Sequence, residues 1–296
     1  MSERRRAEAV LLATTAIWGT TFVGVKEALA VWPPFSLMAF RFGLAALAFL
    51  PVLVRPGAVD GKTLRRGAIL GVLIFLGFSL QTLGLGRTSE ARSAFFTALS
   101  TILVPLLGWS FLKRTPVAGT VAAMALGTGG IACLFGVPLE DGVRDGDLLT
   151  AACAIVFAIQ ILLLGEYLRE SPVLALTGVE LATTAALSIA SAGIEARPVP
   201  AFTGGNVALL VYLGLAATAA TLWGQVYGQR HTTANRAAFL FALEPVFAVF
   251  FAWLVRGRIP GSLEWLGGAF VVAAAIVADR PLPQRLRRGL FREAPA

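Results

Sequence analysis

Ten apolar stretches divide the chain, and each has about the length of a helix that crosses a lipid bilayer. Such a helix needs about 20 apolar residues, because each residue adds about 1.5 Å and the hydrocarbon core is about 30 Å thick. Charge clusters and turns rich in Pro and Gly separate the stretches. They are expected at residues 9–27, 35–54, 67–86, 92–112, 117–136, 147–168, 173–193, 207–229, 236–255 and 262–279. This pattern predicts an all-α integral membrane protein with ten transmembrane helices.

Composition agrees with a membrane protein and argues against a further domain. Hydrophobic residues make up 57% of the chain and charged residues 14%, with a mean hydropathy of +0.77, whereas soluble domains are about 25% charged. The links between the stretches are too short for a soluble catalytic or nucleotide-binding domain. The first stretch follows three arginines but carries Trp18 and Thr20 and no small-residue cleavage site, so we expect a mature helix rather than a signal peptide.

The basic residues indicate how the helices are oriented. If the N-terminus is cytoplasmic, 17 of the 25 Lys and Arg residues fall in cytoplasmic segments and 7 in external ones, while Arg41 lies within a stretch. Cytoplasmic loops collect positive residues, so both termini are expected in the cytoplasm and the protein in the cell (inner) membrane. The net charge of +8 then reflects topology and affinity for the lipid bilayer, not a nucleic-acid partner.

The chain contains an internal repeat. An offset of 144 residues aligns Gln81–Pro116 with Gln225–Pro260 without a gap, and 11 of these 36 positions are identical. The expected halves are residues 1–140 and 141–296, with five stretches each. Because five is odd, the second half enters the membrane from the opposite side, which predicts two inverted five-helix repeats. Inverted repeats can open a shared central cavity to either side in turn, as alternating access requires.

Four segments have sequences and an order that are typical of one family of membrane proteins. They are AIWGTTFVGVKEAL (16–29), PFSLMAFRFGLAALAFLP (34–51), SEARSAFFTALSTILVPLLGW (89–109) and TTANRAAFLFALEPVFAVFFAWLVRGRIPGSLEWLGGAFVVAAAIV (232–277). Together they resemble the EamA family of the drug/metabolite transporter superfamily. The resemblance covers nearly the whole chain. It implies a central substrate cavity and secondary transport, often efflux of amino acids, other metabolites or drugs. The family often has an acid where this chain has Leu112-Lys113-Arg114 and Arg256-Gly257-Arg258, so no role is carried over for that acid.

Polar side chains within the stretches are the candidate functional residues. A charge at mid-helix costs roughly 2.5–3.5 kcal/mol on insertion scales, so such residues face the bundle interior or a cavity. The candidates for substrate binding are Trp18, Arg41, Gln81, Gln160, Trp223, Gln225 and Tyr227, and the two acids at depth are Glu180 and Glu244.

Arg41 and Glu180 each have two interpretations. Arg41 is either the counter-ion for a carboxylate or phosphate on the substrate or a structural charge, which snorkels to the interface or bonds between helices with Glu180 as a candidate partner. Glu180 lies near the repeat equivalent of Arg41, at an offset of 138 or 139 residues. An apolar environment disfavours a charged carboxylate, so Glu180 is the first candidate for proton coupling if transport is coupled to protons. Otherwise it pairs with Arg41 or faces interfacial water.

The remaining polar and aromatic candidates also have structural alternatives. Gln81 and Gln225 are repeat equivalents that either bond across helices or line the two ends of the cavity. Trp18 stands beside small residues, which suits a cavity wall or a close helix crossing. Trp223 and Tyr227 could line a pocket for an aromatic or amphipathic solute. Gln160 lies in the sixth stretch, where a buried amide also suits a cavity wall.

Prolines interrupt the equivalent helices of the two halves. Glu244 and Pro245 stand in the ninth stretch, and the first-half proline, Pro105, comes four residues after the position equivalent to Pro245. Proline removes an amide and crowds the carbonyl one turn earlier. The sequence therefore predicts helix breaks at different heights and a gating role for Pro105, Glu244 and Pro245, with solute or proton binding by Glu244 as the alternative.

These features favour a secondary active transporter that exports small metabolites such as amino acids, or amphipathic drugs, by alternating access around a central cavity. An intramembrane enzyme and a channel or sensor are the alternatives. An enzyme would need a cluster of catalytic groups at membrane depth, and the only histidine, His231, falls in a turn without a second His or Cys nearby. We expect no catalytic residues, no metal and no cofactor. The expected partners are a small-molecule substrate and the lipid bilayer, and the expected state is a monomer or homodimer.

Overall fold

The computed structural model describes residues 2–135, 142–195, 197–257 and 259–278, and within them the regular structure is helical, with no strand. The expected boundary between the halves near residue 140 and the basic tail beginning at Arg280 lie outside these residues. The elements are α1 (Glu3–Gly19), α2 (Thr21–Leu29), α3 (Pro34–Leu53), α4 (Gly61–Arg87), α5 (Glu90–Ala98), α6 (Ser100–Leu112), α7 (Ala118–Phe135), α8 (Asp145–Tyr167), α9 (Val173–Glu195), α10 (Gly204–Val211), the π-helix η1 (Tyr212–Ala220), α11 (Thr221–Arg230), α12 (Ala234–Phe241), α13 (Glu244–Arg256) and α14 (Ser262–Val277).

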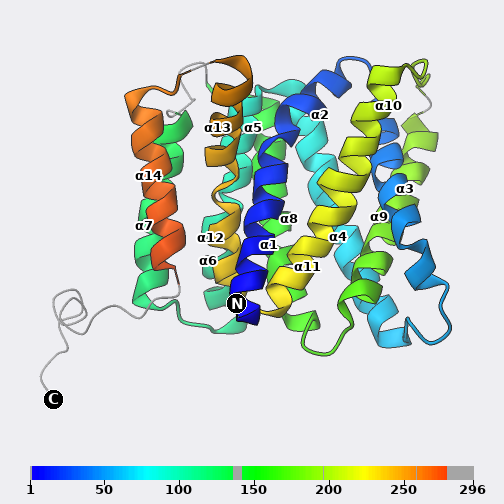
Figure 1. The fold of residues 1–296 in the computed structure, drawn as a ribbon, viewed down its shortest axis with the longest axis horizontal. Helices are drawn as coiled ribbons and strands as arrows, with labels where there is room; N and C mark the ends of the chain where they lie inside the picture. Colours follow the sequence, from blue (N-terminus) through cyan, green and yellow to red (C-terminus); the bar gives the residue numbers. More distant parts are fainter. Residues whose placement is uncertain (1, 136–141, 196, 258, 279–296) are drawn as a thin grey trace, which may run out of the picture.

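The described helices confirm the predicted membrane architecture. Nine helical segments among the described residues are long and apolar enough to cross a bilayer, and α14, with 16 residues, takes the tenth position. Five of the spans belong to each half. Figure 1 shows the spans standing side by side, with the N-terminus at one end of the bundle. That end is called the N-terminal side below, and the other end the opposite side.

Helix packing follows a pseudo-twofold relation between the halves. The second spans, α3 and α9, pack against each other, as do the fifth spans, α7 and α14. The third span of one half packs against the first span of the other, which pairs α4 with α8 and α11 with α1. Figure 1 shows α7 and α14 at one edge of the bundle and α3 and α9 at the other. The two halves are therefore interleaved rather than separate bodies.

The fourth and ninth spans begin with the same kind of N-terminal cap at equivalent residues. Ser89 caps α5 by accepting from the amide of Arg92, and Thr233 caps α12 by accepting from the amide of Arg236. These caps are 144 residues apart, as are the two arginines. Side-chain oxygens of Ser and Thr satisfy amides that lack a partner in the first turn. The fourth and ninth spans therefore begin in the same way on opposite sides of the bundle.

Both the fourth and the ninth span are broken, but the predicted difference in height is wrong. In the first half the break falls at Leu99, between α5 and α6, and Pro105 lies inside the continuous helix α6. In the second half the break falls at Ala242 and Leu243, and Pro245 is in the first turn of α13. Because Leu99 and Leu243 are repeat equivalents, the two breaks lie at the same position within the two inverted repeats. Proline is tolerated in a first turn, whose amides have no partner within the helix.

Two irregular segments have no counterpart in the other half. The first span is interrupted at Thr20, between α1 and α2, whereas its equivalent α8 is continuous. The eighth span contains η1, whereas its equivalent α4 is α-helical. The hydroxyl groups of Thr20 and Tyr212, the first residue of η1, are hydrogen-bonded. The two irregular segments therefore contact each other.

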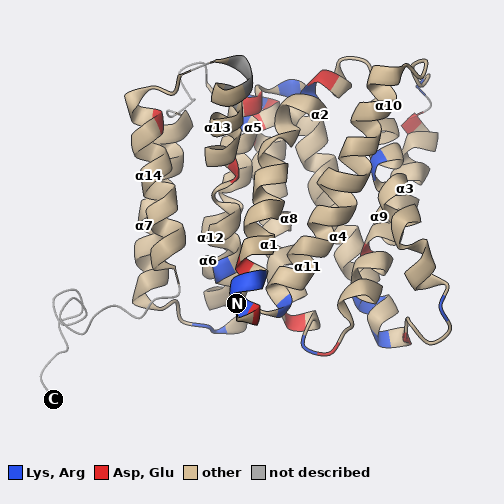
Figure 2. Cartoon of the chain, viewed as in Figure 1, with Lys and Arg blue, Asp and Glu red and all other residues tan. Residues whose placement is uncertain are grey.

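Charged residues gather at the two ends of the bundle, and few lie between them (Figure 2). On the N-terminal side, Glu170 follows α8 and forms ion pairs with Lys62 and Arg66 at the start of α4, the second at 2.8 Å. Hydrogen bonds from Lys62 and Arg66 hold the pKa of Glu170 below its usual value. The charged side chains at this end are therefore in contact with water and also join α8 to α4.

Two glycines allow α7 and α14 to pack closely. A Cβ atom on Gly130 would lie 2.8 Å from the Gly267 carbonyl oxygen, and one on Gly267 would lie 2.6 Å from the Gly130 carbonyl oxygen. Close backbone approach of this kind needs residues without side chains. Gly129 is adjacent in sequence but has no such neighbour within 4 Å.

We expect Gly267→Ala to destabilise the protein by about 1–3 kcal/mol, because the added methyl group overpacks the contact between α7 and α14. Gly129→Ala is the matched control and should leave the melting temperature unchanged or raise it, since alanine favours helix. Thermal unfolding of purified protein in detergent measures both. Equal melting temperatures for the two variants would contradict the assigned contact.

Candidate functional site

A cavity lies at the centre of the bundle and is lined by residues of both halves. Several lining residues are repeat equivalents of one another. At the offset of 144 residues the equivalent pairs are Phe78 and Leu222, Gln81 and Gln225, Thr97 and Phe241, and Ser100 and Glu244. At an offset of 139 residues, which relates α1 and α2 to α8, they are Trp18 and Phe157, and Thr21 and Gln160. The cavity therefore lies where the two inverted halves meet.

Arg41 is one of the two charged residues lining the cavity. Its Nε atom donates to Thr218 Oγ1 (2.5 Å), and its Nη2 atom donates to the carbonyl oxygen of Ala217 (3.2 Å). Both acceptors belong to η1, whose wider turns change which carbonyls remain available. The Arg41 guanidinium carbon also lies 4.7 Å from the ring centroid of Phe78. The π-helix and this ring hold a buried cation at the cavity wall.

Glu244 is the second charged residue of the cavity and stands at the break between α12 and α13. The backbone here is tightly packed, since a Cβ atom on Gly19 would lie 2.9 Å from the Glu244 carbonyl oxygen. The cavity thus combines one cation, one acid and a largely aromatic and aliphatic wall.

The alternative in which Arg41 pairs with Glu180 is wrong. Arg41 bonds to η1, whereas Glu180 Oε1 accepts a hydrogen bond from Gln160 Nε2 (2.9 Å). Glu180 is fully buried, is not among the cavity-lining residues, and lies behind Gln160. Its Oε2 atom has no hydrogen-bond partner among the described residues. The acid therefore contacts the cavity through an amide rather than directly.

Trp18 has both roles suggested by the sequence. Its ring lines the cavity, and its Nε1 atom donates to Thr221 Oγ1 (3.0 Å). The neighbouring Gly19 packs on α13 without space for a side chain, since a Cβ atom there would lie 2.8 Å from Phe247 Cβ.

Trp223 and Tyr227 do not line the cavity. Their rings stack on each other with centroids 5.4 Å apart, and the Tyr227 ring lies 4.9 Å from that of His231. Residues four apart share a helix face, while Gln225, two residues from each, faces the other way and lines the cavity. The spacing of these three residues along one helix is enough to predict this opposition.

Sequence reasoning also missed residues that line the cavity. Thr21, Phe157 and Ser100 are the repeat equivalents of Gln160, Trp18 and Glu244, so the repeat itself carried the signal that could have found them. Gln81 lines the cavity as expected and donates to Thr97 Oγ1 (3.3 Å). Among the described residues, no group of three or more His, Cys, Asp or Glu residues is placed to hold a metal.

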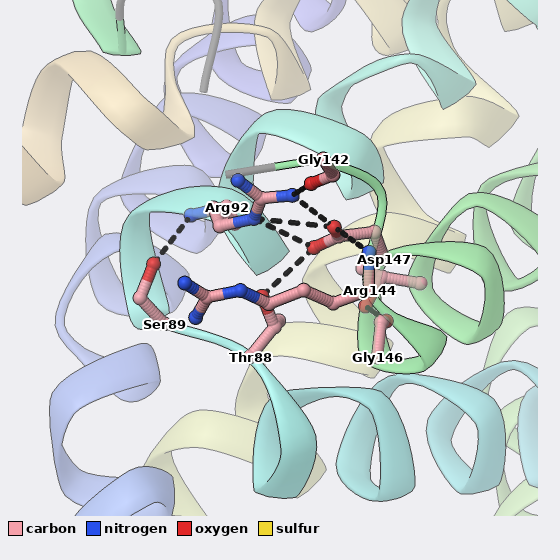
Figure 3. A network of polar contacts seen from close by, with 8 residues as sticks. Thr88, Ser89, Arg92, Gly142, Arg144, Gly146 and Asp147 are labelled. Carbon is pink, nitrogen blue, oxygen red and sulfur yellow. Dashed lines mark hydrogen bonds and ion pairs between the residues drawn. The ribbon is translucent and has the colours of Figure 1, made fainter. Parts of the chain in front are cut away.

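A buried ion pair joins the halves on the opposite side of the bundle (Figure 3). Arg92, at the start of α5, donates from Nε to Asp147 Oδ1 (3.0 Å) and pairs with it through Nη2 as well. Asp147, in the first turn of α8, also accepts from Thr88 Oγ1 (2.8 Å) and the Arg144 amide (2.8 Å). The Arg92 side chain is 7% exposed and that of Asp147 is fully buried. The network ties the first half to the second.

The equivalent pair joins the halves on the N-terminal side. Arg236, at the start of α12, donates from Nε to Glu8 Oε1 (3.1 Å) and from Nη2 to Glu8 Oε2 (3.3 Å). Arg236 is the repeat equivalent of Arg92, and Glu8 is that of Asp147. These side chains are 15% and 21% exposed, so this pair meets more water than the first. The sequence showed the repeated arginines but not their partners in the other half.

Comparisons with known proteins agree with this architecture. A sequence profile described as the EamA-like transporter family matches residues 5–136 and 144–278. A protein of Archaeoglobus fulgidus named as an uncharacterized transporter is 30% identical over 279 residues, which cover 94% of this chain and 87% of that protein. A chloroplastic WAT1-related protein of Arabidopsis thaliana is 26% identical, over 92% of this chain and 69% of its own length.

A more distant relative and a solved structure are also similar to this chain over nearly its whole length. The uncharacterized transporter YyaM of Bacillus subtilis is 22% identical, over 91% of this chain and 92% of its own length. A crystal structure with 21% identity superposes with a TM-score of 0.76 over 95% of this chain and 99% of that one, and so shares the fold. Since the family profile covers both five-helix halves, the chain belongs to the EamA-like transporter family and is a multi-pass membrane transporter.

Proposed function

We propose that the protein is a secondary active carrier that exports small amphipathic solutes, such as amino acids or amphipathic drugs, by alternating access. The observation that carries this proposal is the cavity lined by equivalent residues of two inverted halves, because exchanging their conformations exposes the same cavity to the other side. The carrier works in the cell (inner) membrane with both termini in the cytoplasm, as a monomer or homodimer.

The cavity chemistry supports a solute with an apolar body and charged ends. Aromatic and aliphatic side chains form most of the wall, which suits an apolar group. Arg41 supplies a cation for a carboxylate and Glu244 an acid for an ammonium group. Arg41 is the one cation lining the cavity among the described residues, which argues against solutes with several phosphate charges.

The two ion pairs between the halves support alternating access. Arg92 with Asp147 closes the opposite side, and Arg236 with Glu8 closes the N-terminal side. A carrier that opens to one side at a time must separate one pair while it keeps the other. Glu180 is the candidate for proton coupling, because no basic partner holds it permanently ionised among the described residues.

Purified protein in liposomes tests the carrier. We expect saturable counterflow of radiolabelled phenylalanine, and about a ten-fold weaker apparent affinity in Arg41→Gln and in Glu244→Gln, since a hydrogen bond to a charged group contributes about 1.5–3 kcal/mol. Trp223→Phe, outside the cavity, is the control and should transport normally. Chemical turnover of a lipid or solute without net movement would refute a carrier.

The ion pairs predict opposite changes in access. In a variant whose native cysteines, Cys133 and Cys153, are replaced, the substitution Ser100→Cys places a single thiol in the cavity wall. Its labelling by a membrane-impermeant thiol reagent then measures how exposed the cavity is. Arg92→Gln should raise labelling from the opposite side, and Arg236→Gln from the N-terminal side. Arg92→Gln should raise labelling more than Arg236→Gln does, because the Arg92–Asp147 pair is more deeply buried and breaking a buried pair costs about 3–5 kcal/mol.

A charge exchange provides the control for the opposite side. Combining Arg92→Asp with Asp147→Arg restores an ion pair and should bring labelling back toward the wild-type level. If Arg92→Gln and Arg236→Gln raise labelling from the same side, the pairs do not close opposite ends.

Pro245 is proposed to keep the ninth span hinged at the break beside Glu244. Pro245→Ala adds an amide that can bond to the Phe241 carbonyl and continue α12 into α13. We expect turnover to fall several-fold while solute affinity stays unchanged. Pro105→Ala is the matched control, because α6 already runs through that position, and it should have a smaller effect. Equal turnover in both variants and the wild type would contradict the hinge.

A further inference from the structure

A second pocket, of about 440 Å³, lies on the N-terminal side of the bundle and shares no lining residue with the central cavity. It is bounded by the ends of α6, α8 and α11 and by the start of α12, so both halves contribute to its wall. Three of its lining residues are arginines, Arg114, Arg169 and Arg230, and one is an acid, Glu166. The wall of this basic pocket therefore carries a net positive charge.

The three arginines come from three different elements. Arg114 follows α6 in the first half, whereas Arg169 follows α8 and Arg230 ends α11 in the second half. Arg114 Nη2 lies 2.6 Å from Glu166 Oε1, and Arg169 Nε lies 3.9 Å from Glu166 Oε2, so both guanidinium groups flank one carboxylate. Arg230 forms no ion pair with any other described residue. The single acid thus leaves most of the positive charge of the pocket unbalanced.

The internal repeat shows that the fold does not require these arginines. At an offset of 139 residues, Ala30 stands at the position of Arg169, and at an offset of 144 residues, Gly86 stands at the position of Arg230. A pocket on the opposite side of the bundle is lined by two acids and, among the described residues, by no Lys or Arg. The preference of cytoplasmic segments for basic residues accounts for the side on which the arginines are expected, but not for their convergence on one pocket.

The basic pocket is open where the first half has a lysine side chain. Lys26 Nζ donates to the carbonyl oxygens of Leu85 (2.6 Å) and Thr88 (2.7 Å) at the end of α4. The repeat equivalent of Lys26 is Gly165, which lines the pocket together with the equivalents of both acceptor residues. A Cβ atom on Gly165 would lie 3.7 Å from Ala234 Cβ, an ordinary contact, so packing does not exclude a side chain there. The second half leaves this space to a ligand.

Phosphate is the anion that matches this wall. A guanidinium group donates parallel hydrogen bonds to phosphate or carboxylate oxygens. A phosphate group has more oxygens than a carboxylate and can therefore accept from several arginines at once. The pocket also has the size of a ligand site, since such sites measure about 300–1,000 Å³. Its residues stand at the ends of membrane spans, and basic pockets between such helices on the cytoplasmic side bind phospholipid head groups.

We propose that the basic pocket binds a phosphate group, with Arg114, Arg169 and Arg230 as its donors. The group belongs to the head group of an anionic phospholipid or to a soluble phosphate compound on the same side. It is not the transported solute, because the central cavity has Arg41 as its one lining cation among the described residues. A phosphate held by arginines of both halves joins them on the N-terminal side. Under the proposed function, the bound phosphate therefore holds that side closed.

Binding to the purified full chain in maltoside detergent tests the site without any transport assay. The two probes are inorganic phosphate and a short-chain phosphatidylglycerol, each titrated by calorimetry at low ionic strength. We expect one saturable site, and the probe that binds more tightly identifies the source of the phosphate. Binding should weaken as sodium chloride is added, because ions screen exposed charges. If neither probe saturates a single site, the proposal is wrong.

Charge variants separate the basic pocket from the basic surface around it. Arg169→Gln and Arg230→Gln should each weaken binding about five-fold, whereas Arg65→Gln, on the same side but outside the pocket, should leave it unchanged. Glu166→Gln removes the acid between two of the arginines and should tighten binding, while Glu170→Gln, outside the pocket, should not. Melting temperatures show that each variant is folded. Equal losses in Arg230→Gln and Arg65→Gln would overturn the site, because the charge would then act without a defined pocket.

Thiol labelling tests the effect of the bound phosphate on access to the central cavity. In the protein with Ser100→Cys as its single thiol, a saturating amount of the tighter probe should lower labelling from the N-terminal side several-fold. Arg230→Gln should remove this effect. If the probe binds and labelling does not change, the site stands and its role in closure is wrong. If the probe binds to a protein that fails to transport, the carrier function is wrong and the site stands.

Discussion

A bilayer offers no water to polar groups in its core, and the organisation of this protein depends on how it satisfies them without water. Each unsatisfied group there costs several kcal/mol. Arg41 is held by a hydroxyl and a carbonyl of a π-helix, and Glu180 by the amide of Gln160. The irregular segments of the fold are therefore places where backbone groups become available to buried side chains or to the cavity.

The inverted repeat extends the same constraint to the whole molecule. Equivalent residues line the cavity from both halves, and equivalent arginines bind acids of the other half at both ends of the bundle. The symmetry is incomplete in an informative way. At an offset of 139 residues, the equivalent of the basic residue Arg41 is the acid Glu180. Under the proposed function, only one half therefore supplies the candidate acid for proton coupling at this position.

Much of this architecture could be predicted from the sequence, because span length and charge clusters follow directly from bilayer thickness. The repeat also identified Gln81 and Gln225, which line the cavity. The prediction of a helix break at Pro105 was wrong, because a proline removes one helical hydrogen bond but does not require the helix to end there. The break in the fourth span lies at Leu99, and the break in the ninth span includes the equivalent residue, Leu243. Trp223 and Tyr227 face away from Gln225 because residues two apart on an α-helix point about 200° away from each other.

Contacts between the two halves could not be predicted from the sequence, for a different reason. Arg92 and Asp147, like Arg236 and Glu8, are far apart in the chain, and their pairing depends on how two inverted units interleave. Helical periodicity predicts which face of its own helix a residue occupies, but it does not predict which other helix packs against that face. The hydrogen bonds of Gln225 to Gln160 and of Gln229 to the Ile161 carbonyl likewise require α8 and α11 to lie side by side.

The central claim is that the two ends of the bundle open in alternation around one cavity. Spin labels at Ala91 and Val143 report the opposite side, and labels at Arg4 and Asn235 report the N-terminal side, beside the two ion pairs. Double electron–electron resonance of protein in nanodiscs gives both distance distributions as solute and pH are varied. The account predicts that one distance lengthens as the other shortens. Two distances that lengthen together, or that never change, would contradict it.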